Sequence, residues 1–427
     1  MSDYTTDGKG QNTMGKKLQP KLRFRGFTDA WEQRRFVECF DFLKTNTFPR
    51  DYLQLSGNGT VDIHYGDILI NYNSCLSIAN NALPCIKRED YLDCHNYSLL
   101  KDGDVVFADT AEDRTVGKCV ELLKVGERRA LAGLHTIAVR NRIECAVGYL
   151  GFYFNSPFYR KQLLPKMQGS KVVAISKDVL KQSFISVPST KEQLLISKLL
   201  NKIDSLVDAE KRKLDLLQKK KTTLLRQIFG QKLRFKGYDN PWEPRRLGEI
   251  ATVVGGGTPD TNNPSYWNGD INWFTPAEIG SNVYASKSER RITEEGLEHS
   301  SAKLLPAGRT ILFTSRASIG LTAILTVDAC TNQGFQSLVV SDRTDVFFLF
   351  GLCNQIKAQA IRNAAGSTFI EVSGKQLARI PLQVPSLDEQ RRIGKIVRTM
   401  DSLIDAATRK IDILKLKKKA LLQQMFV

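Results

Sequence analysis

The sequence predicts two mixed α/β (α+β) globular domains that alternate with two long helices, and we expect the helices to pair as an antiparallel coiled coil with pseudo-twofold symmetry. The main reason is an internal repeat. Residues 21–36 (KLRFRGFTDAWEQRRF) return without a gap as residues 232–247 (KLRFKGYDNPWEPRRL), and residues 188–229 return as residues 385–426. Shared segments separated by divergent inserts indicate one structural unit used twice.

The repeat divides the chain into five parts. With 427 residues the chain exceeds one ordinary core, and each insert has the usual size of a domain. The first residues are polar and lack the apolar stretch of a secretion signal, which predicts a flexible tail. The expected parts are a tail at 1–20, a globular domain at 21–187, a spacer helix at 188–230, a second domain at 231–384 and a second spacer helix at 385–427.

Charge is the second strong feature of the chain. A net charge of +17 and a pI near 9.4 favour a polyanionic partner, with nucleic acid first, although a basic surface that only maintains solubility stays open. No apolar run is long enough to cross a bilayer, so we expect a cytoplasmic protein without a membrane span. Eight cysteines lie far apart without a CxxC pair, which favours neither a zinc site nor a disulfide framework.

Apolar residues that alternate at spacings of three and four predict the two long helices, because this is the pattern of a coiled-coil seam. Both copies keep the seam, and each has a lysine at the matched position, Lys221 or Lys418. The apolar seam residues are Leu200, Ile203, Val207, Leu214, Leu217, Leu224 and Ile228 in the first helix, and Val397, Met400, Ile404, Ile411, Leu414, Leu421 and Met425 in the second.

The start of each helix is marked by a serine followed three residues later by a glutamate. The pairs Ser189 with Glu192 and Ser386 with Glu389 predict capping boxes. Helices of about 38 residues, at about 1.5 Å per residue, give rods of roughly 57 Å that can hold two domains apart. The second helix lacks the continuation that follows the first, which predicts a cyclic layout with the C-terminus close to the segment that begins at Lys21.

Both inserts are expected to share one fold. Short apolar runs at 105–108, 136–139, 311–314 and 337–340 predict strands, and the pattern over 345–364 predicts a helix. The segment GSKVVAISKDVLKQSFISVP in the first insert matches GSTFIEVSGKQLARIPLQVP in the second, and LAGLH stands where the second has TNQGF. Divergence at surface loops predicts that the two domains recognise different ligands.

Candidate nucleic-acid contacts follow from side-chain chemistry. Arg and Lys pair with guanine edges or phosphates, Asn and Gln with adenine, and Ser or Thr with either, although each residue could also be an ordinary solvated polar residue. The candidates are Arg114, Lys118, His135, Lys166, Gln168, Ser170 and Lys171 in the first insert, and Thr258, Arg316, Ser318, Asn332, Gln333, Gln336, Ser367 and Thr368 in the second.

Familiar catalytic motifs are missing from the sequence. The run GGGTP at 255–259 lacks the GK[ST] ending of a phosphate loop, and VSGKQL at 372–377 has Gln where Ser or Thr is needed. Four histidines form no HExxH pattern, and no GxSxG is present. We therefore expect a non-catalytic chain without a bound cofactor or metal, which reads a ligand or organises partners.

Taken together, the two long repeated helices, the PS-x-x-EQ helix starts, the GS run before each helix and the TNQGF segment resemble the specificity subunit of a type I restriction-modification system. The resemblance covers residues 21–427. The first insert departs from the pattern at LAGLH and lacks Thr after Ser170.

This resemblance implies that each insert is a target recognition domain reading one half of a split, asymmetric site in double-stranded DNA. It implies that the helices set the unread gap, and that two modification subunits dock on them with S-adenosylmethionine for adenine methylation. Restriction subunits that use ATP and Mg would cleave. Two alternatives stay open, a nucleic-acid-binding or coiled-coil assembly scaffold without sequence specificity, and an enzyme with an unrecognised site.

Overall fold

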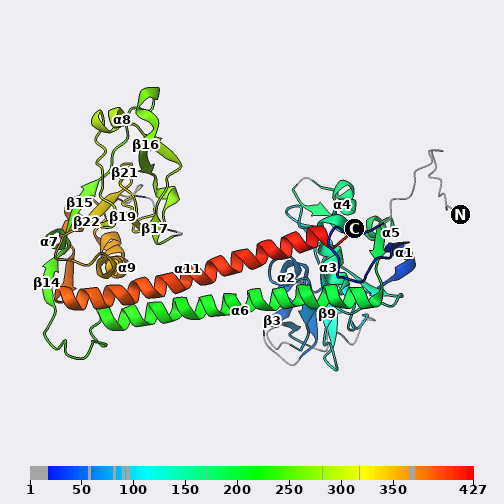
Figure 1. Ribbon diagram of the computed structural model, residues 1–427. Helices are drawn as coiled ribbons and strands as arrows, with labels where there is room; N and C mark the ends of the chain where they lie inside the picture. The colour runs from blue at the N-terminus through cyan, green and yellow to red at the C-terminus, as the bar shows by residue number, and fades with distance from the viewer. Residues whose placement is uncertain are drawn as a thin grey trace. The chain divides into compact units, whose positions relative to one another are not determined.

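The computed structural model describes residues 18–55, 59–79, 83–88, 92, 97–169, 171–280, 282–316, 318–364 and 371–427 (Figure 1). The chain divides into two compact units, Met1–Lys211 with Lys410–Val427 (unit 1) and Arg212–Arg409 (unit 2). Each unit thus contains one globular domain and a part of both long helices. Residues 1–17 of the expected tail lie outside the described residues, and Leu18 already packs against the core of unit 1.

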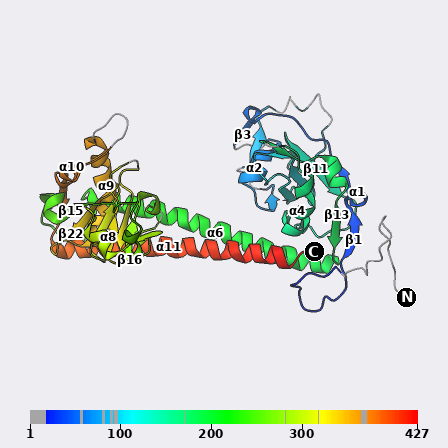
Figure 2. The same ribbon diagram turned by 90° about the horizontal axis from the view of Figure 1, so that it is seen from above.

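Unit 1 contains two sheets and two strand pairs. The five-stranded sheet has the order β2 (Phe40–Phe42), β11 (Thr136–Asn141), β7 (Val105–Ala108), β9 (Cys119–Leu123) and β5 (Cys75–Ser77). The four-stranded sheet has the order β10 (Ala130–Ala132), β4 (Val61–Ile63), β6 (Pro84–Ile86) and β3 (Leu53–Leu55). The pairs are β8 (Thr110–Ala111) with β12 (Val173–Ala174), and β1 (Glu32–Arg35) with β13 (Phe184–Val187), which lie side by side in Figure 2.

Among the described residues, five short helices, the first half of one long helix and the last part of the other complete unit 1. They are α1 (Phe36–Cys39), α2 (Tyr65–Ile70), α3 (Leu150–Asn155), α4 (Pro157–Leu163), α5 (Lys177–Lys181), the first half of α6 (Thr190–Phe229) and the last part of α11 (Leu387–Gln424). The helix α3 is almost wholly apolar and lies in the core, where Phe152 and Phe154 are fully buried. Aromatic rings therefore fill the space between the five-stranded sheet and the helices.

Unit 2 repeats this plan. Its five-stranded sheet has the order β15 (Ala251–Gly255), β22 (Gln336–Val340), β19 (Thr310–Phe313), β20 (Thr322–Leu325) and β17 (Tyr284–Ala285). A second sheet has the order β18 (Arg290–Ile292), β16 (Trp267–Phe274) and β21 (Ala329–Thr331), and β14 (Glu243–Arg246) pairs with β23 (Pro381–Val384). The helices are α7 (Leu247–Ile250), α8 (Glu294–Glu298), α9 (Val346–Asn363), α10 (Gly374–Ala378) and α11 (Leu387–Gln424).

The two five-stranded sheets have the same pairing scheme. In each, the first four strands pair antiparallel and the last pair is parallel. The four apolar runs predicted as strands are β7, β11, β19 and β22, and the predicted helix at 345–364 is α9. The mixed α/β class and the shared fold of the inserts are thus confirmed.

Ion pairs fix the direction of the helix pair. In unit 1, Lys418 contacts Asp204 at 2.6 Å and Lys410 contacts Glu210 at 2.5 Å, so residue numbers rise on α6 as they fall on α11 and the helices are antiparallel. In unit 2, Lys221 pairs with Asp401. Burial raises the pKa of the Asp204 carboxyl, and the nearby Lys418 partly offsets that rise.

The polar positions of the predicted seam are therefore occupied by ion pairs. Lys221 with Asp401 and Lys418 with Asp204 are the same pair in the two repeats. The apolar seam residues are buried or half-buried, whereas Leu216 and Leu416, which lie off the seam, are each 66% exposed.

Among the described residues, no helix is both long and apolar enough to cross a membrane.

Candidate nucleic-acid interface

In unit 2, three segments far apart in the sequence meet at the end of the five-stranded sheet. The Ser315 N–H donates to the Gly334 carbonyl at 2.7 Å, and the Val372 N–H donates to the Ser315 carbonyl at 3.1 Å. Beside them Arg316 forms a β-bridge with Glu371, and its Nε lies 2.9 Å from Glu371 Oε1, with both side chains about half exposed. A charged pair is thus held at the rim by backbone hydrogen bonds.

The TNQGF segment brings amide groups to the same place. Thr258 Oγ1 donates to Gln333 Oε1 at 2.6 Å, and the Gly334 N–H donates to Asn332 Oδ1 at 2.9 Å. A Cβ on Gly256 would lie 1.9 Å from the Asn332 carbonyl oxygen. The glycine run therefore permits a close approach of two backbones. This packing role accounts for the glycines without a phosphate loop, whose motif they do not match.

We call Thr258, Arg316, Asn332, Gln333 and Glu371 the second polar edge. It collects four of the predicted contacts and adds Glu371, which the sequence did not single out. The other four candidates of the second insert differ in placement. Ser318 is exposed next to the edge and accepts a hydrogen bond from Thr314 Oγ1 at its carbonyl, Gln336 is half-buried against Gly255 and Gly374, and Ser367 and Thr368 lie outside the described residues.

Unit 1 has the same backbone arrangement with other side chains. The Asp109 N–H donates to the His135 carbonyl at 3.0 Å and the Ile175 N–H donates to the Asp109 carbonyl at 2.8 Å, so Asp109 takes the place of Ser315. His135 Nδ1 lies 3.5 Å from Asp109 Oδ1, and His135 has a left-handed φ of 54°. The Arg316 bridge to Glu371 is replaced by Thr110 paired with Ala174.

We call Asp109, Thr110 and His135 the first polar edge. These hydrogen bonds also correct the alignment of LAGLH with TNQGF. The Gly133 N–H donates to Ile63 as the Asn332 N–H donates to Phe274, which places Gly133 at the Asn332 position and His135 at the Gly334 position, one residue away from a letter-by-letter match.

Most other candidates of unit 1 do not lie on the first polar edge. Lys118 is half-buried and donates from Nζ to the Leu69 carbonyl at 2.9 Å, and Lys166 Nζ donates to Gln182 Oε1 at 3.2 Å. The backbone of Gln168 pairs with Ala174, next to the edge. Arg114 and Lys171 are exposed, and Ser170 lies outside the described residues.

The sequence of unit 2 matches a known family. Residues 239–416 match the sequence model described as "Type I restriction modification DNA specificity domain". Residues 239–416 are therefore similar to a DNA specificity domain of type I restriction-modification systems. This match agrees with the resemblance inferred from the sequence, and the second polar edge lies inside the matched residues.

Named relatives agree with this match. The chain is 35% identical over 177 residues, 40% of its length, to the type I restriction enzyme MjaIX specificity subunit of Methanocaldococcus jannaschii, and 33% identical over 185 residues, 42% of its length, to the EcoR124I/EcoR124II specificity subunit of Escherichia coli. It spans less than half of either relative, 41% and 45%.

A solved structure shares the fold. The S subunit of a type I restriction-modification system from M. genitalium superposes with a TM-score of 0.63 at 15% identity, over 96% of this chain and 99% of that one. The fold of the whole chain, and not only that of residues 239–416, is therefore known from another protein.

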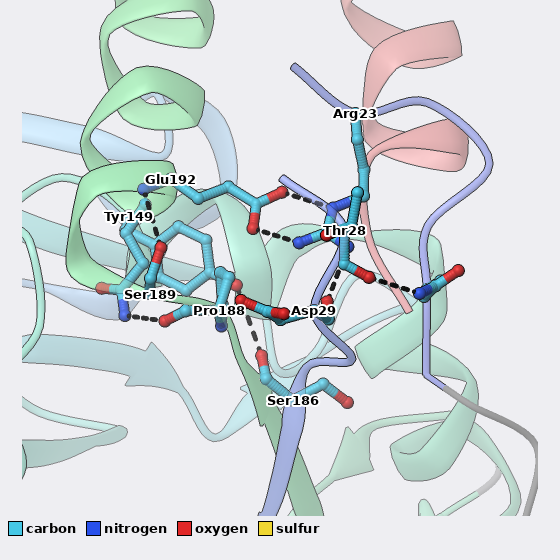
Figure 3. A network of polar contacts seen from close by, with 10 residues as sticks. Arg23, Thr28, Asp29, Tyr149, Ser186, Pro188, Ser189 and Glu192 are labelled. Carbon is cyan, nitrogen blue, oxygen red and sulfur yellow. Dashed lines mark hydrogen bonds and ion pairs between the residues drawn. The ribbon is translucent and has the colours of Figure 1, made fainter. Parts of the chain in front are cut away.

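Each unit contains one copy of a repeated arginine–glutamate pair, here called the clasp, which joins the N-terminal segment of the repeat to the start of a long helix. Arg23 donates from Nε and Nη2 to the two Glu192 carboxylate oxygens at 2.8 and 2.7 Å, as Figure 3 shows. In unit 2, Arg234 holds Glu389 in the same way at 2.8 and 2.9 Å. Bidentate pairs of this kind fix geometry as well as charge.

The clasp corrects part of the predicted capping boxes. The predicted serine caps are present: the Glu192 N–H donates to Ser189 Oγ at 3.4 Å, and the Glu389 N–H donates to Ser386 Oγ at 3.4 Å. The glutamate side chains, however, pair with the arginines of the clasp. A buried carboxylate gains more from a guanidinium than from one backbone N–H.

The predicted cyclic closure is confirmed within unit 1. The Leu22 N–H donates to the Gln424 carbonyl at 2.9 Å, and the ring of Phe426 lies 6.3 Å from that of Trp31. In unit 2, Phe229 lies 6.4 Å from Trp242 in the same manner. The end of α11 thus meets the first repeat as the end of α6 meets the second.

A buried carboxyl packs against Gly133, two residues before His135 of the first polar edge. Asp62 is fully buried, its Oδ2 accepts from Asn46 Nδ2 at 2.7 Å, and Oδ1 has no hydrogen-bond partner among the described residues. A Cβ on Gly133 would lie 2.3 Å from that Oδ1, so the chain packs tightly over it. Burial raises the pKa of Asp62 to about 7.

We expect replacement of Asp62 by asparagine to remove one source of pH dependence in the stability of unit 1. Because the folded-state pKa lies above the unfolded value, the folded state binds the proton more tightly, and stability falls as pH rises from about 4 to about 7. Asparagine cannot ionise. Between pH 4 and pH 8, the free energy of unfolding of the Asp62→Asn protein should therefore rise by roughly 2–4 kcal/mol relative to that of the parent.

Urea unfolding of both proteins at pH 5 and pH 8 measures this difference. Burial also raises the pKa of Glu121 to about 7, and because Glu121 is present in both proteins its effect cancels. If the free energy of unfolding changed equally with pH in both proteins, Asp62 would not titrate in this range.

Proposed function

We propose that this chain is the sequence-reading subunit of a type I restriction-modification complex. Each globular domain would read one half of a bipartite, asymmetric site in double-stranded DNA, and the helix pair would fix the unread gap between the halves. The named relatives are specificity subunits of type I restriction enzymes, which supports this assignment.

The observation that carries the proposal is one backbone frame with two sets of polar groups. Asp109 and Ser315 make the same pair of backbone hydrogen bonds. Around that shared frame one edge presents Arg316 with Glu371, and the other presents His135 with Asp109. Side chains with different donors and acceptors distinguish different base edges, so a constant scaffold with varied polar ends suits two different half-sites.

Exposed apolar residues on the helices support docking of partner subunits. Leu206 and Leu403 occupy matched positions of the two repeats and are 41% and 45% exposed, and Leu216 and Ile413 are matched in the same way. A repeated surface can bind two copies of one partner. We propose that two modification subunits dock there.

In this proposal the chemistry belongs to the partners. Modification subunits would carry S-adenosylmethionine for adenine methylation, and restriction subunits would use ATP and Mg for translocation and cleavage. The described residues contain no cluster of His, Cys, Asp or Glu arranged to hold a metal ion. This chain would contribute the choice of DNA sequence.

Domain exchange tests the proposal. Residues 37–187 are replaced by the corresponding insert of a related subunit, the chain is expressed with its modification partners, and methylated adenines are mapped across the host genome. We expect one half-site to change while the other half-site and the gap stay constant. The reciprocal exchange of residues 248–384 should change only the other half-site.

An unchanged methylation pattern after either exchange would refute the assignment. The net charge of +17 favours a second candidate, a nucleic-acid scaffold without sequence preference. That candidate predicts binding that depends on salt and is equal for all sequences, even with the partners present.

A further inference from the structure

A cationic pocket lies in unit 1 away from the first polar edge. Its volume is about 440 Å³, and it opens where the loop before β5, the loop before β9, α4 and α11 meet. Four of its lining residues are basic, Arg114, Lys118, Arg160 and Lys418, and none of the described lining residues is acidic. Two of them, Arg114 and Lys118, were predicted from the sequence to contact nucleic acid.

Hydrogen bonds hold the basic groups in place. Arg160 Nη2 donates to the carbonyls of Arg114 at 2.5 Å and Val116 at 3.0 Å, so the guanidinium ties the loop to α4. Lys418 Nζ contacts Asp204 at 2.6 Å and lies 5.3 Å from the centre of the Phe152 ring. The positions of these cations are therefore set before any ligand arrives, which lowers the entropic cost of binding.

The local electrostatics favour an anion. Burial lowers the pKa of the Lys118 ammonium, and repulsion from Lys418 and Arg160 lowers it further. Asp204 offsets the charge of Lys418, and the exposed Asp113 partly offsets that of Arg160. An anion between Lys118, Arg160 and Arg114 would relieve this repulsion in a partly desolvated site, where charge interactions are stronger than in water.

Unit 2 contains a matched but weaker pocket of about 300 Å³. Lys221 occupies the position of Lys418, and Lys357 occupies that of Arg160. Gly320 takes the place of Gly117, and both have a left-handed φ, 82° and 76°. The strand pairing of β20 and β9 then places Leu321 where unit 1 has Lys118. The second pocket is thus lined by two basic residues instead of four, and the position of the central Lys118 is apolar.

We propose that the pocket of unit 1 binds a phosphate group. Its size and its four basic side chains suit a tetrahedral oxyanion, which accepts hydrogen bonds on every side, and Arg160 Nη1 is buried without a hydrogen-bond partner among the described residues. The phosphate can be a diester of the DNA backbone or part of a free phosphate compound. The pocket also accounts for the lysine kept at the seam of α11, since Lys418 reaches both Asp204 and the pocket.

The test uses the full chain and inorganic phosphate at constant ionic strength, followed by calorimetry or ³¹P NMR. Lys118→Leu copies the residue that unit 2 has at this position and should weaken phosphate binding at least about 10-fold, which is about 1.4 kcal/mol. Arg114→Gln, at an exposed side chain, should weaken it in the same direction. Lys161→Gln removes an equal charge from the exposed face of α4 and should leave it unchanged.

A reciprocal variant strengthens the test. Leu321→Lys should improve phosphate binding in unit 2, because it restores the third basic group. The proposal is wrong if the parent protein does not bind phosphate, or if Lys118→Leu and Arg114→Gln bind it as the parent does. Thermal unfolding of each variant shows whether the fold is kept, and Arg114→Gln decides the matter if Lys118→Leu does not fold.

Duplex DNA distinguishes the two sources of phosphate. If the ligand is a DNA diester, Lys118→Leu should lower the salt dependence of DNA binding by about one contact, while Lys161→Gln should not. If phosphate binding is lost and the salt dependence is unchanged, the ligand is a free phosphate compound. Since the phosphate titration needs no sequence recognition, its failure would leave the domain-exchange result untouched, and the reverse also holds.

Discussion

Replacement of Phe426 by alanine should destabilise unit 1 by about 3–5 kcal/mol, the usual cost of removing a buried phenyl ring. Phe426 is 3% exposed. Its ring lies 6.3 Å from that of Trp31 and 5.9 Å from those of Tyr149 and Tyr153. Alanine would leave a cavity among these three aromatic rings. Tyr149 and Tyr153 are held in place by hydrogen bonds to the Ser186 backbone, so the site cannot collapse to fill the cavity.

The second repeat offers a matched variant. Phe229 lies between Trp242 and Phe348 in unit 2, and Phe229→Ala should destabilise that unit instead. Because a chain with two units need not unfold in one step, the measurement is hydrogen exchange resolved to peptides of each unit. Leu416→Ala, at a residue that is 66% exposed, is the control and should change stability by less than about 0.5 kcal/mol.

Each phenylalanine-to-alanine substitution should raise the rate of hydrogen exchange only in its own unit. Equal loss of protection in both units after Phe426→Ala would show that the closure does not belong to unit 1 alone. Loss in neither would show that the aromatic cluster contributes little.

Removal of one heptad from each long helix should change the DNA gap and leave both half-sites intact. Deletion of 207–213 from α6 and 409–415 from α11 keeps the ion pairs of Lys418 with Asp204 and of Lys221 with Asp401. Seven residues at about 1.5 Å each shorten the pair by about 10 Å. At about 3.4 Å per base pair this corresponds to about 3 base pairs.

Mapping of methylated adenines measures the new gap. Equal deletion from both helices matters, because deletion from one alone would shift the register and separate one of the two ion pairs. A gap that stays constant in the doubly shortened protein would refute the role of the helices as a ruler.

The large-scale plan of the chain could be predicted because repeats and seams are local, periodic signals. The duplicated segments predicted the two domains, and the spacing of apolar residues at three and four positions predicted both long helices. Runs such as 105–108 are fully apolar, and the strand β7 is buried along its whole length. Elements that depend only on residues close together in the sequence could therefore be predicted.

Partners that come from distant segments could not be predicted. Glu192 was expected to return to the backbone of its own helix, but Arg23, 169 residues away, takes its carboxylate. Glu371 could not be predicted because a single acidic residue belongs to no sequence motif, although it forms an ion pair with Arg316 at the second polar edge. Lys118 was grouped with surface contacts by residue type, and only the fold shows that it is half-buried in a pocket.

The clasp has an evolutionary consequence. Arg23 with Glu192 and Arg234 with Glu389 join the repeated segments that flank each divergent insert, and all four residues lie outside the inserts at 37–187 and 248–384. A gene that acquires a foreign insert between these repeated flanks by homologous recombination would inherit the attachment points intact. Under the proposed function, one genetic exchange would then be enough to change the half-site that an insert reads.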